Sequence, residues 1–197
     1  ALGVQVVVDD SQPSEPAGVP LVHIFNHRSP CDGLVIQGVR RLPGMPTAQR
    51  HLKWVLPGYA AAARNAGSAV LDHRQPSSRL EGVMRASALL RDHGQIMLAP
   101  NGSLVTPIEQ RVSPSAWMLA QHYNGSVVPW LFRYEGLEGA VGARYRPLAL
   151  LLSRLTAPLG TIHCRRGRSQ DLVLPTDPRD REGFSRAVQA YYQQAQD

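Results

Sequence analysis

Short apolar runs alternate with segments of helical periodicity along the chain, and no other feature restricts the fold as strongly. Each run ends near glycine, proline, asparagine or a charged residue, which is typical of strands. The predicted strands are 4–8, 21–25, 68–71, 95–99, 126–132 and 160–164. Apolar residues at three- and four-residue spacing predict helices at 31–41, 52–66, 77–93, 112–123 and 181–195. The pattern is clearest at 77–93, where the spaced residues are Leu80, Val83, Met84, Ala88 and Leu90. This order predicts an α/β fold, a mostly parallel mixed sheet flanked by helices.

The length and composition predict one domain. The chain has 197 residues, of which 43% are hydrophobic and 18% charged, so it can bury a substantial core. The proline-rich stretches at 9–20 and 43–46 are interpreted as loops rather than linkers between domains. We therefore expect a single domain over residues 1–197. Because the sequence begins with Ala1 rather than Met, a membrane anchor upstream is left open.

The net charge of +6 favours an anionic partner. The charge is carried mostly by arginine, since Lys53 is the only lysine, and arginine binds phosphate through two parallel hydrogen bonds. A phosphorylated small molecule or an anionic membrane surface fits this charge. Nucleic acid is not expected, because the sequence has no zinc finger or RNA-recognition signature and only 6% aromatic residues for base stacking.

The two cysteines do not suggest a metal site or a disulfide. Cys31 and Cys164 form neither a CxxC pair nor a zinc-binding spacing, and a reducing compartment is favoured. His163 and Cys164 are adjacent, so in a strand they point to opposite faces and are poor joint metal ligands. His23 lies inside an apolar strand, where a core histidine with its hydrogen bonds satisfied is more common than a ligand. No metal or cofactor is expected.

The segment "NHRSPCDG" at 26–33 has two interpretations. It follows a predicted strand, and ligands of parallel sheets bind beyond the carboxyl ends of the strands. In the structural interpretation, Ser29 caps a helix, Pro30 takes its first position, and Asp32 completes a capping box. In the functional interpretation, Asp32 accepts the Nδ1 proton of His27 and leaves Nε2 free to take a proton from a hydroxyl. That is a base and its orienting carboxylate without an enzyme nucleophile, so the attacking group is a substrate hydroxyl.

Four segments in order resemble the blocks of the glycerolipid and lysophospholipid acyltransferases, the 1-acylglycerol-3-phosphate acyltransferase family. "NHRSPCDG" resembles the first block, NH-x-S-x-x-D. "LKWVLPGYAAAARNAGSAVLDHR" at 52–74 resembles the second, which ends in Gly-x-x-x-x-Asp-x-Arg. "IMLAPNGSL" at 96–104 takes the place of the third, usually Phe-Pro-Glu-Gly-Thr-Arg, and "SVVPWLF" at 126–132 resembles the fourth. The resemblance extends over about residues 4–190.

The resemblance implies transfer of a fatty acyl group from an acyl thioester to a lipid hydroxyl. It implies His27 as general base and Asp32 as its orienting group. The donor is acyl-CoA or acyl carrier protein, and the acceptor a lysophospholipid or related lipid. Backbone N–H groups near Gly102 or at the helix start, 30–32, are expected to stabilise the oxyanion. The implied substrate-binding residues are Asn26, Ser29, Lys53, Arg74, Asn101, Gly102, Ser103 and Pro129.

The third block departs from the family pattern. Asn101, Ser103 and Leu104 stand in place of the glutamate, threonine and arginine. The resemblance assigns that glutamate and arginine to a glycerol-phosphate head group, and neutral Leu104 does not pair with phosphate. Arg74, with Lys53, Arg28 or Arg111, is the expected replacement charge. A non-phosphate hydroxyl acceptor (a sugar, aminolipid or pigment) and a catalytically degenerate lipid-binding protein remain open.

An arginine-flanked apolar segment at 144–160 is a candidate membrane contact. "YRPLALLLSRLTAPLG" at 145–160 lies beside Arg144 and includes Arg146 and Arg154, which is typical of segments at the lipid interface but also of a buried helix or loop. The run is too short to span a bilayer. We therefore expect a cytoplasmic protein that is peripheral to the membrane.

Overall fold

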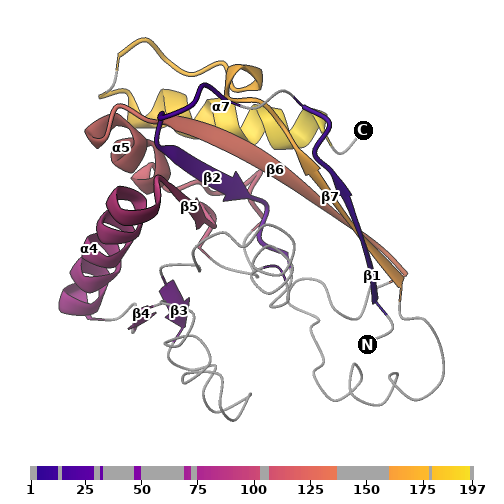
Figure 1. Ribbon diagram of the computed structural model, residues 1–197, viewed down its shortest axis with the longest axis horizontal. Coiled ribbons are helices and arrows are strands. Elements are labelled where there is room, and N and C mark those ends of the chain that lie inside the picture. The colour runs from indigo at the N-terminus through magenta and orange to yellow at the C-terminus, as the bar shows by residue number, and fades with distance from the viewer. Residues whose placement is uncertain are drawn as a thin grey trace.

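The computed structural model describes residues 4–12, 15–28, 32, 47–49, 69–71, 75–102, 107–136, 160–177 and 179–195. Five strands form a mixed, mostly parallel sheet in the order β1-β7-β6-β2-β5 (Figure 1). These strands are β1 (Val4–Asp9), β2 (Leu21–Phe25), β5 (Gln95–Leu98), β6 (Ser126–Glu135) and β7 (Gly160–Arg166). A separate parallel pair consists of β3 (Thr47–Gln49) and β4 (Ala69–Leu71). The described helices are α4 (Pro76–His93), α5 (Ser115–His122), α7 (Arg181–Gln194) and the short 3-10 helix η3 (Ser169–Asp171).

The ten-residue strand β6 joins the two halves of the sheet. Its first half pairs in parallel with β2, up to Phe25 opposite Trp130, and its second half pairs antiparallel with β7, from Trp130 to Glu135. β6 therefore continues past the point where β2 ends. The residues that follow β2 lie beside the second half of β6, at the carboxyl end of a parallel strand where ligands of such sheets bind.

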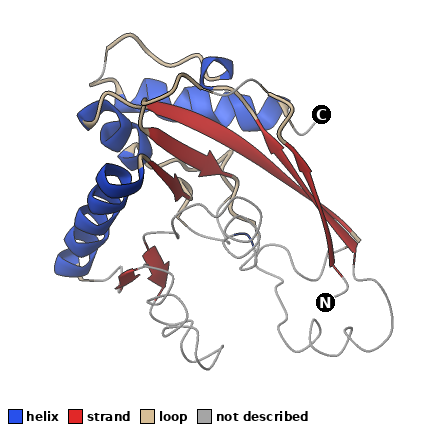
Figure 2. Ribbon diagram, viewed as in Figure 1, coloured by secondary structure: helices blue, strands red, loops and turns tan. Residues whose placement is uncertain are grey.

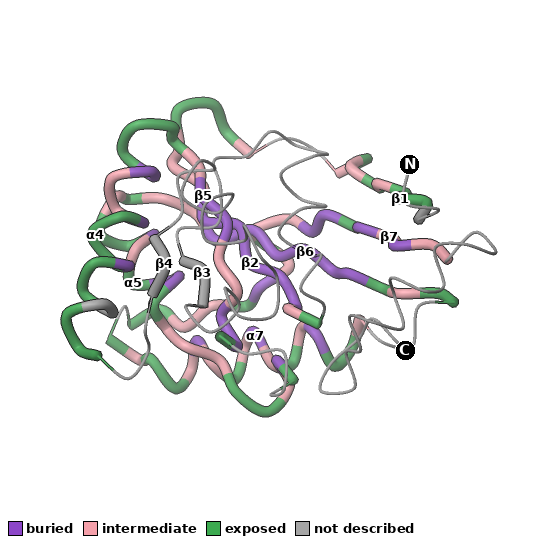
Figure 3. The backbone as a smooth tube through the Cα atoms, turned by 90° about the horizontal axis from the view of Figure 1, so that it is seen from below, coloured by how far each residue is buried: buried purple, intermediate pink, exposed green. Residues whose placement is uncertain are grey.

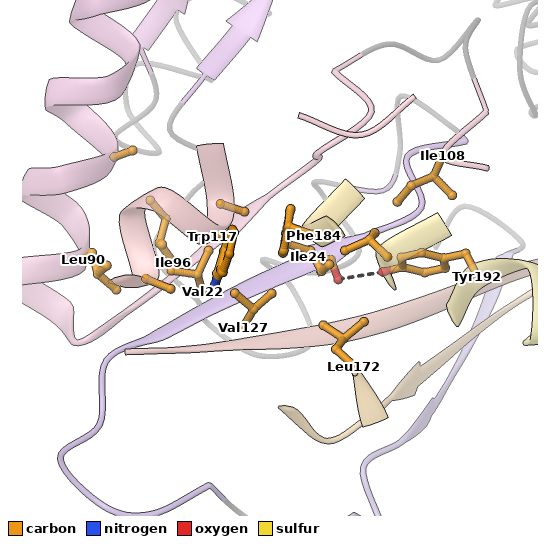
Figure 4. Packing of buried hydrophobic residues seen from close by; sticks show 14 of the residues in the cluster. Val22, Ile24, Leu90, Ile96, Ile108, Trp117, Val127, Leu172, Phe184 and Tyr192 are labelled. Atoms are coloured by element: carbon orange, nitrogen blue, oxygen red, sulfur yellow. Dashed lines mark hydrogen bonds between the residues drawn. The ribbon is translucent and has the colours of Figure 1, made fainter. Parts of the chain in front are cut away.

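The central strands β2 and β6 are buried on both faces of the sheet, as expected of predominantly parallel strands. One face packs against helices α4, α5 and α7 around Trp117, whose ring stacks on Phe184 with 5.3 Å between ring centroids (Figure 4). The other face carries a second cluster, which consists of Phe25, Met97, Trp130, Phe132, Ile162 and Cys164. Because side chains alternate along a strand, Val22 and Ile24 belong to the helix-covered face, and His23 and Phe25 to the other.

The predicted strands and fold class are confirmed (Figure 2). All six predicted strands are present, β6 and β7 being longer than predicted. The helices predicted at 77–93, 112–123 and 181–195 correspond to α4, α5 and α7. Those predicted at 31–41 and 52–66 lie outside the described residues, apart from Asp32, which is helical. β3 was not predicted, because its three residues, TAQ, carry no apolar run.

The apolar residues that identify α4 do not all face the core. The helix starts with Pro76 at its first turn and ends at Gly94, which has a φ of +69° and donates its N–H to Leu90. Its buried apolar residues are Ala86, Leu89 and Leu90. Leu80, Val83 and Met84 are instead 61%, 57% and 64% exposed, and much of α4 is at the surface (Figure 3). Periodicity therefore located the helix but not its buried face.

Candidate active site

Asn26 fixes the point at which the chain leaves β2. Its side-chain Nδ2 donates to the carbonyl of Phe132 at 3.0 Å, and its Oδ1 accepts the N–H of Phe132 at 2.7 Å. The amide thus extends the pairing of β2 with β6 by side-chain bonds. Asn26 is only 1% exposed. This geometry favours a positioning role for Asn26 over the substrate contact expected from the sequence.

His27 and Asp32 lie in direct contact beyond this anchor. His27 Nδ1 is 2.9 Å from Asp32 Oδ2, and the same oxygen accepts the main-chain N–H of Arg28 at 2.8 Å. Asp32 is 1% exposed, whereas the His27 side chain is 17% exposed. A carboxylate only accepts hydrogen bonds, so it favours the tautomer with the proton on Nδ1 and leaves Nε2 as the acceptor.

Both interpretations of Asp32 have a counterpart in this geometry. The bond from Arg28 N–H closes a local turn, as a capping carboxylate does, while Ser29, the expected partner of Asp32 in the capping box, lies outside the described residues. The bond to His27 fixes the tautomer and orientation of an imidazole, which is what the carboxylate of a base dyad does. The two roles use one oxygen and are compatible.

Phe25 and Cys164 are two described neighbours of the dyad. The Phe25 ring meets the His27 ring edge-on at 5.6 Å between centroids. Cys164 is buried and not in a disulfide; burial, followed by the nearby negative charge of Asp32, raises the pKa of its thiol to about 12. A thiol is nucleophilic only as the thiolate, so Cys164 is a packing residue.

The third block meets the first through Asn101. Its Nδ2 donates to the main-chain carbonyl of His27 at 3.1 Å, and Asn101 is 4% exposed. Gly102 follows with a φ of +64°, where glycine is favoured, and donates its N–H to the carbonyl of Ala99 at 3.1 Å. The N–H of Gly102 is thus used within its own turn, whereas Cys31 and Ser103, which also belong to the two expected groups of oxyanion donors, lie outside the described residues.

Pro129 lies in the core. It pairs with Ile24 in the sheet and is buried, and its carbonyl accepts the N–H of Gly167 at 2.8 Å. A Cβ on Gly167 would stand 2.9 Å from Pro129 Cγ, so the two residues are in close contact. Pro129 also alternates with Trp130, which faces the cluster beside His27. Pro129 therefore supports the sheet from the opposite face.

The remaining expected site residues divide into two groups. Ser29, Lys53, Arg74 and Ser103 lie outside the described residues, as does the segment 144–159. Of the alternative cations, Arg28 and Arg111 are both exposed. Among the described residues, no three His, Cys, Asp or Glu side chains are grouped so that they could hold a metal ion.

His23 is a core histidine, as its place in an apolar strand predicted. It is 3% exposed, and its Nδ1 accepts the indole N–H of Trp130 at 3.1 Å. Burial, followed by the charge of Arg166, lowers the pKa of His23 to about 4. His23 is therefore neutral at physiological pH and has no part in the site.

His27 thus lies beyond the carboxyl end of a parallel strand, where ligands of such sheets bind, and its Nδ1 contacts a buried carboxylate. A model of the acyltransferase family matches residues 5–133. This match extends from β1 into β6, includes all four blocks and covers more than half of the chain. The chain therefore belongs to the acyltransferase family, as its resemblance to the glycerolipid acyltransferases indicated. No curated protein matches the sequence.

Proposed function

We propose that this acyltransferase moves a fatty acyl group from an acyl thioester, acyl-CoA or acyl carrier protein, to a hydroxyl of a lysophospholipid or related lipid. The observation that carries the proposal is the 2.9 Å contact between His27 Nδ1 and Asp32 Oδ2. With Nδ1 protonated, the free acceptor on the ring is Nε2. His27 is the general base, and Asp32 is the group that orients it.

The proposed reaction is a direct transfer between the two substrates. His27 Nε2 takes the proton of the acceptor hydroxyl while that oxygen attacks the thioester carbonyl. The tetrahedral intermediate collapses, the carbon–sulfur bond breaks, and the imidazolium returns the proton to the leaving thiolate. Asp32 stabilises the imidazolium between these steps. The high pKa of the Cys164 thiol is consistent with a route that has no acyl-enzyme.

The acceptor is proposed to have a neutral or diester head group. Leu104, in place of the arginine of the family pattern, removes a charge-assisted contact worth about 1.5–3 kcal/mol to a phosphate monoester. The burial of Asn101 and its bond to His27 also direct its amide toward the protein. The same observations favour, as a second candidate, a non-phosphate hydroxyl such as that of a sugar, aminolipid or pigment.

A peripheral membrane surface is proposed as the place where the lipid acceptor is met, on the cytoplasmic side. The net charge of +6 and the arginine-flanked segment 144–160 support this partner. None of the described helices is long and apolar enough to cross a membrane.

The test is thiol release from acyl-CoA in the presence of a series of acceptors. Free CoA that appears together with an equal amount of acylated lipid is the expected result, because transfer breaks the thioester and forms the lipid ester in one reaction, whereas hydrolysis would release CoA and a free fatty acid. A panel of lysolipids, sugars and aminolipids identifies the acceptor class by kcat/KM. Binding of acyl-CoA without release of CoA with any acceptor would instead support the degenerate lipid-binding protein.

A further inference from the structure

We propose that Asn101 is a positioning residue that holds the main chain of His27, and that it does not bind the head group of the acceptor. The inference rests on the proposed role of His27 as base and names a further residue on which that role depends. Asn101 follows β5 in the third block, 74 residues from His27, and its Nδ2 donates to the His27 carbonyl at 3.1 Å. With only 4% of its surface exposed, it faces the protein rather than a substrate.

The bond requires a hydrogen-bond donor at position 101. A carbonyl oxygen only accepts hydrogen bonds, so its partner must donate. The side-chain NH₂ of asparagine donates, whereas a carboxylate offers two acceptors and no proton. The glutamate of the third block in the pattern that this chain resembles could not make this contact. Compared with the glutamate of the family pattern, Asn101 therefore lacks the negative charge and supplies a hydrogen-bond donor at the same place.

The base is thus tethered from three directions. Asn26, the residue before His27, is bonded through its side chain to the main chain of Phe132 on β6. The Asn101 side chain, just after β5, donates to the main-chain carbonyl of His27. Asp32 contacts the His27 ring at Nδ1. Only the last of these bonds touches the imidazole. The first two fix the backbone from which the ring projects, and a displacement of a catalytic group by about 1 Å costs on the order of 10²-fold in rate.

The assignment is tested with Asn101→Asp, which keeps the shape of the side chain but removes its donor. We expect kcat to fall by about 10- to 100-fold, with the KM values for thioester and acceptor within about twofold of wild type. A residue that contacts the acceptor would instead raise the acceptor KM, and that result would overturn the assignment. If the aspartate variant fails to fold, Asn101→Ala, which loses the donor without adding charge, should show the same fall in kcat with the same unchanged KM values. Asn124→Asp is the matched control, since Asn124 is exposed in the turn after α5.

A second readout reports the geometry without turnover. In wild type, the Nδ1 proton of His27 shared with Asp32 should give a resolved low-field NMR signal that His27→Ala removes. Asn101→Asp should weaken or shift this signal, whereas Asn124→Asp should leave it unchanged. An unchanged signal and an unchanged kcat in Asn101→Asp would show that Asn101 does not position the base.

The two proposals fail in different ways. If His27→Ala keeps its turnover, His27 is not the general base. The positioning role of Asn101 is then tested only by the NMR signal of the His27 Nδ1 proton in Asn101→Asp. Turnover that is lost in His27→Ala but untouched by Asn101→Asp refutes only the positioning role. The assignment also predicts that Asn101→Glu lowers kcat even when Leu104→Arg is present. Restoring the glutamate and arginine of the family pattern at positions 101 and 104 should therefore not restore kcat.

Discussion

Replacing Asp32 by asparagine separates the two roles of this residue. Asp32 Oδ2 accepts one hydrogen bond from His27 Nδ1–H and another from the main-chain N–H of Arg28, and the oxygen and NH₂ group of an asparagine amide cannot both act as this acceptor. If its NH₂ group faces the ring, Nδ1 must accept, the proton moves to Nε2, and the base is lost. The same exchange in a Ser-His-Asp triad costs about 10⁴ in kcat, or about 5 kcal/mol of transition-state stabilisation. We expect a loss of about 10³–10⁴ in the rate of thiol release.

The effect on stability should be much smaller. Loss of one charge-assisted bond at a buried site costs about 1–3 kcal/mol of the free energy of unfolding, measured by urea denaturation. Asp171→Asn is the matched control, because Asp171 also accepts a nearby main-chain N–H, that of Arg168 at 2.7 Å. The control should lose stability but not turnover. A normal rate in Asp32→Asn, with only a loss of stability, would show that Asp32 is a cap and not part of a dyad.

Three further predictions concern the core and the acceptor. The pKa of His23 is about 4 in the folded protein and about 6.5 in the unfolded chain. Between pH 6.5 and 4 the unfolded chain therefore binds a proton at His23 that the folded protein does not bind. About 3 kcal/mol of the free energy of unfolding, present above pH 6.5, should be lost on acidification to pH 4. Urea titrations should show a shallower decline in His23→Gln; an equal decline would assign the effect to other groups. Leu90→Ala should lower the free energy of unfolding by about 2–5 kcal/mol, and Leu80→Ala by no more than about 0.5 kcal/mol; equal losses would contradict the buried face of α4. Wild type should use lysophosphatidate at least about tenfold less well than a zwitterionic lysolipid by kcat/KM, and Leu104→Arg should narrow the gap. A wild-type preference for lysophosphatidate would contradict this acceptor assignment.

The sequence predicts the sheet well, because each strand is encoded by its own residues. LVHIF at 21–25 is an apolar run of strand length that ends at a polar residue, and the structure has β2 at the same positions. β3 has no such run and was missed. The buried face of α4 was not evident either, since Leu80 and Leu90 are equally apolar in sequence. Which of them is covered depends on elements that lie elsewhere in the chain.

The contact between His27 and Asp32 was predictable from the sequence, but the long-range contacts around it were not. His27 and Asp32 are close in sequence, so their spacing already suggested a contact. The contacts of Asn26 with Phe132 and of Asn101 with His27 span 106 and 74 residues and involve main-chain groups. Every residue has such groups, so no residue type signals these contacts. The sequence suggested substrate contacts for Asn26 and Asn101, and it gave no sign of the bonds that their side chains make to main-chain groups of Phe132 and His27.

The central claim is that His27 is the base of acyl transfer, and the rate of thiol release in His27→Ala tests it most directly. His163→Ala is the matched control, because His163 Nε2 also lies 3.1 Å from a carboxylate, that of Glu135, but on an exposed part of β7. We expect His27→Ala to fold normally and to lose at least about 10³ in kcat, whereas His163→Ala should keep the wild-type rate. A folded His27→Ala protein that transfers acyl groups at the wild-type rate would contradict the account.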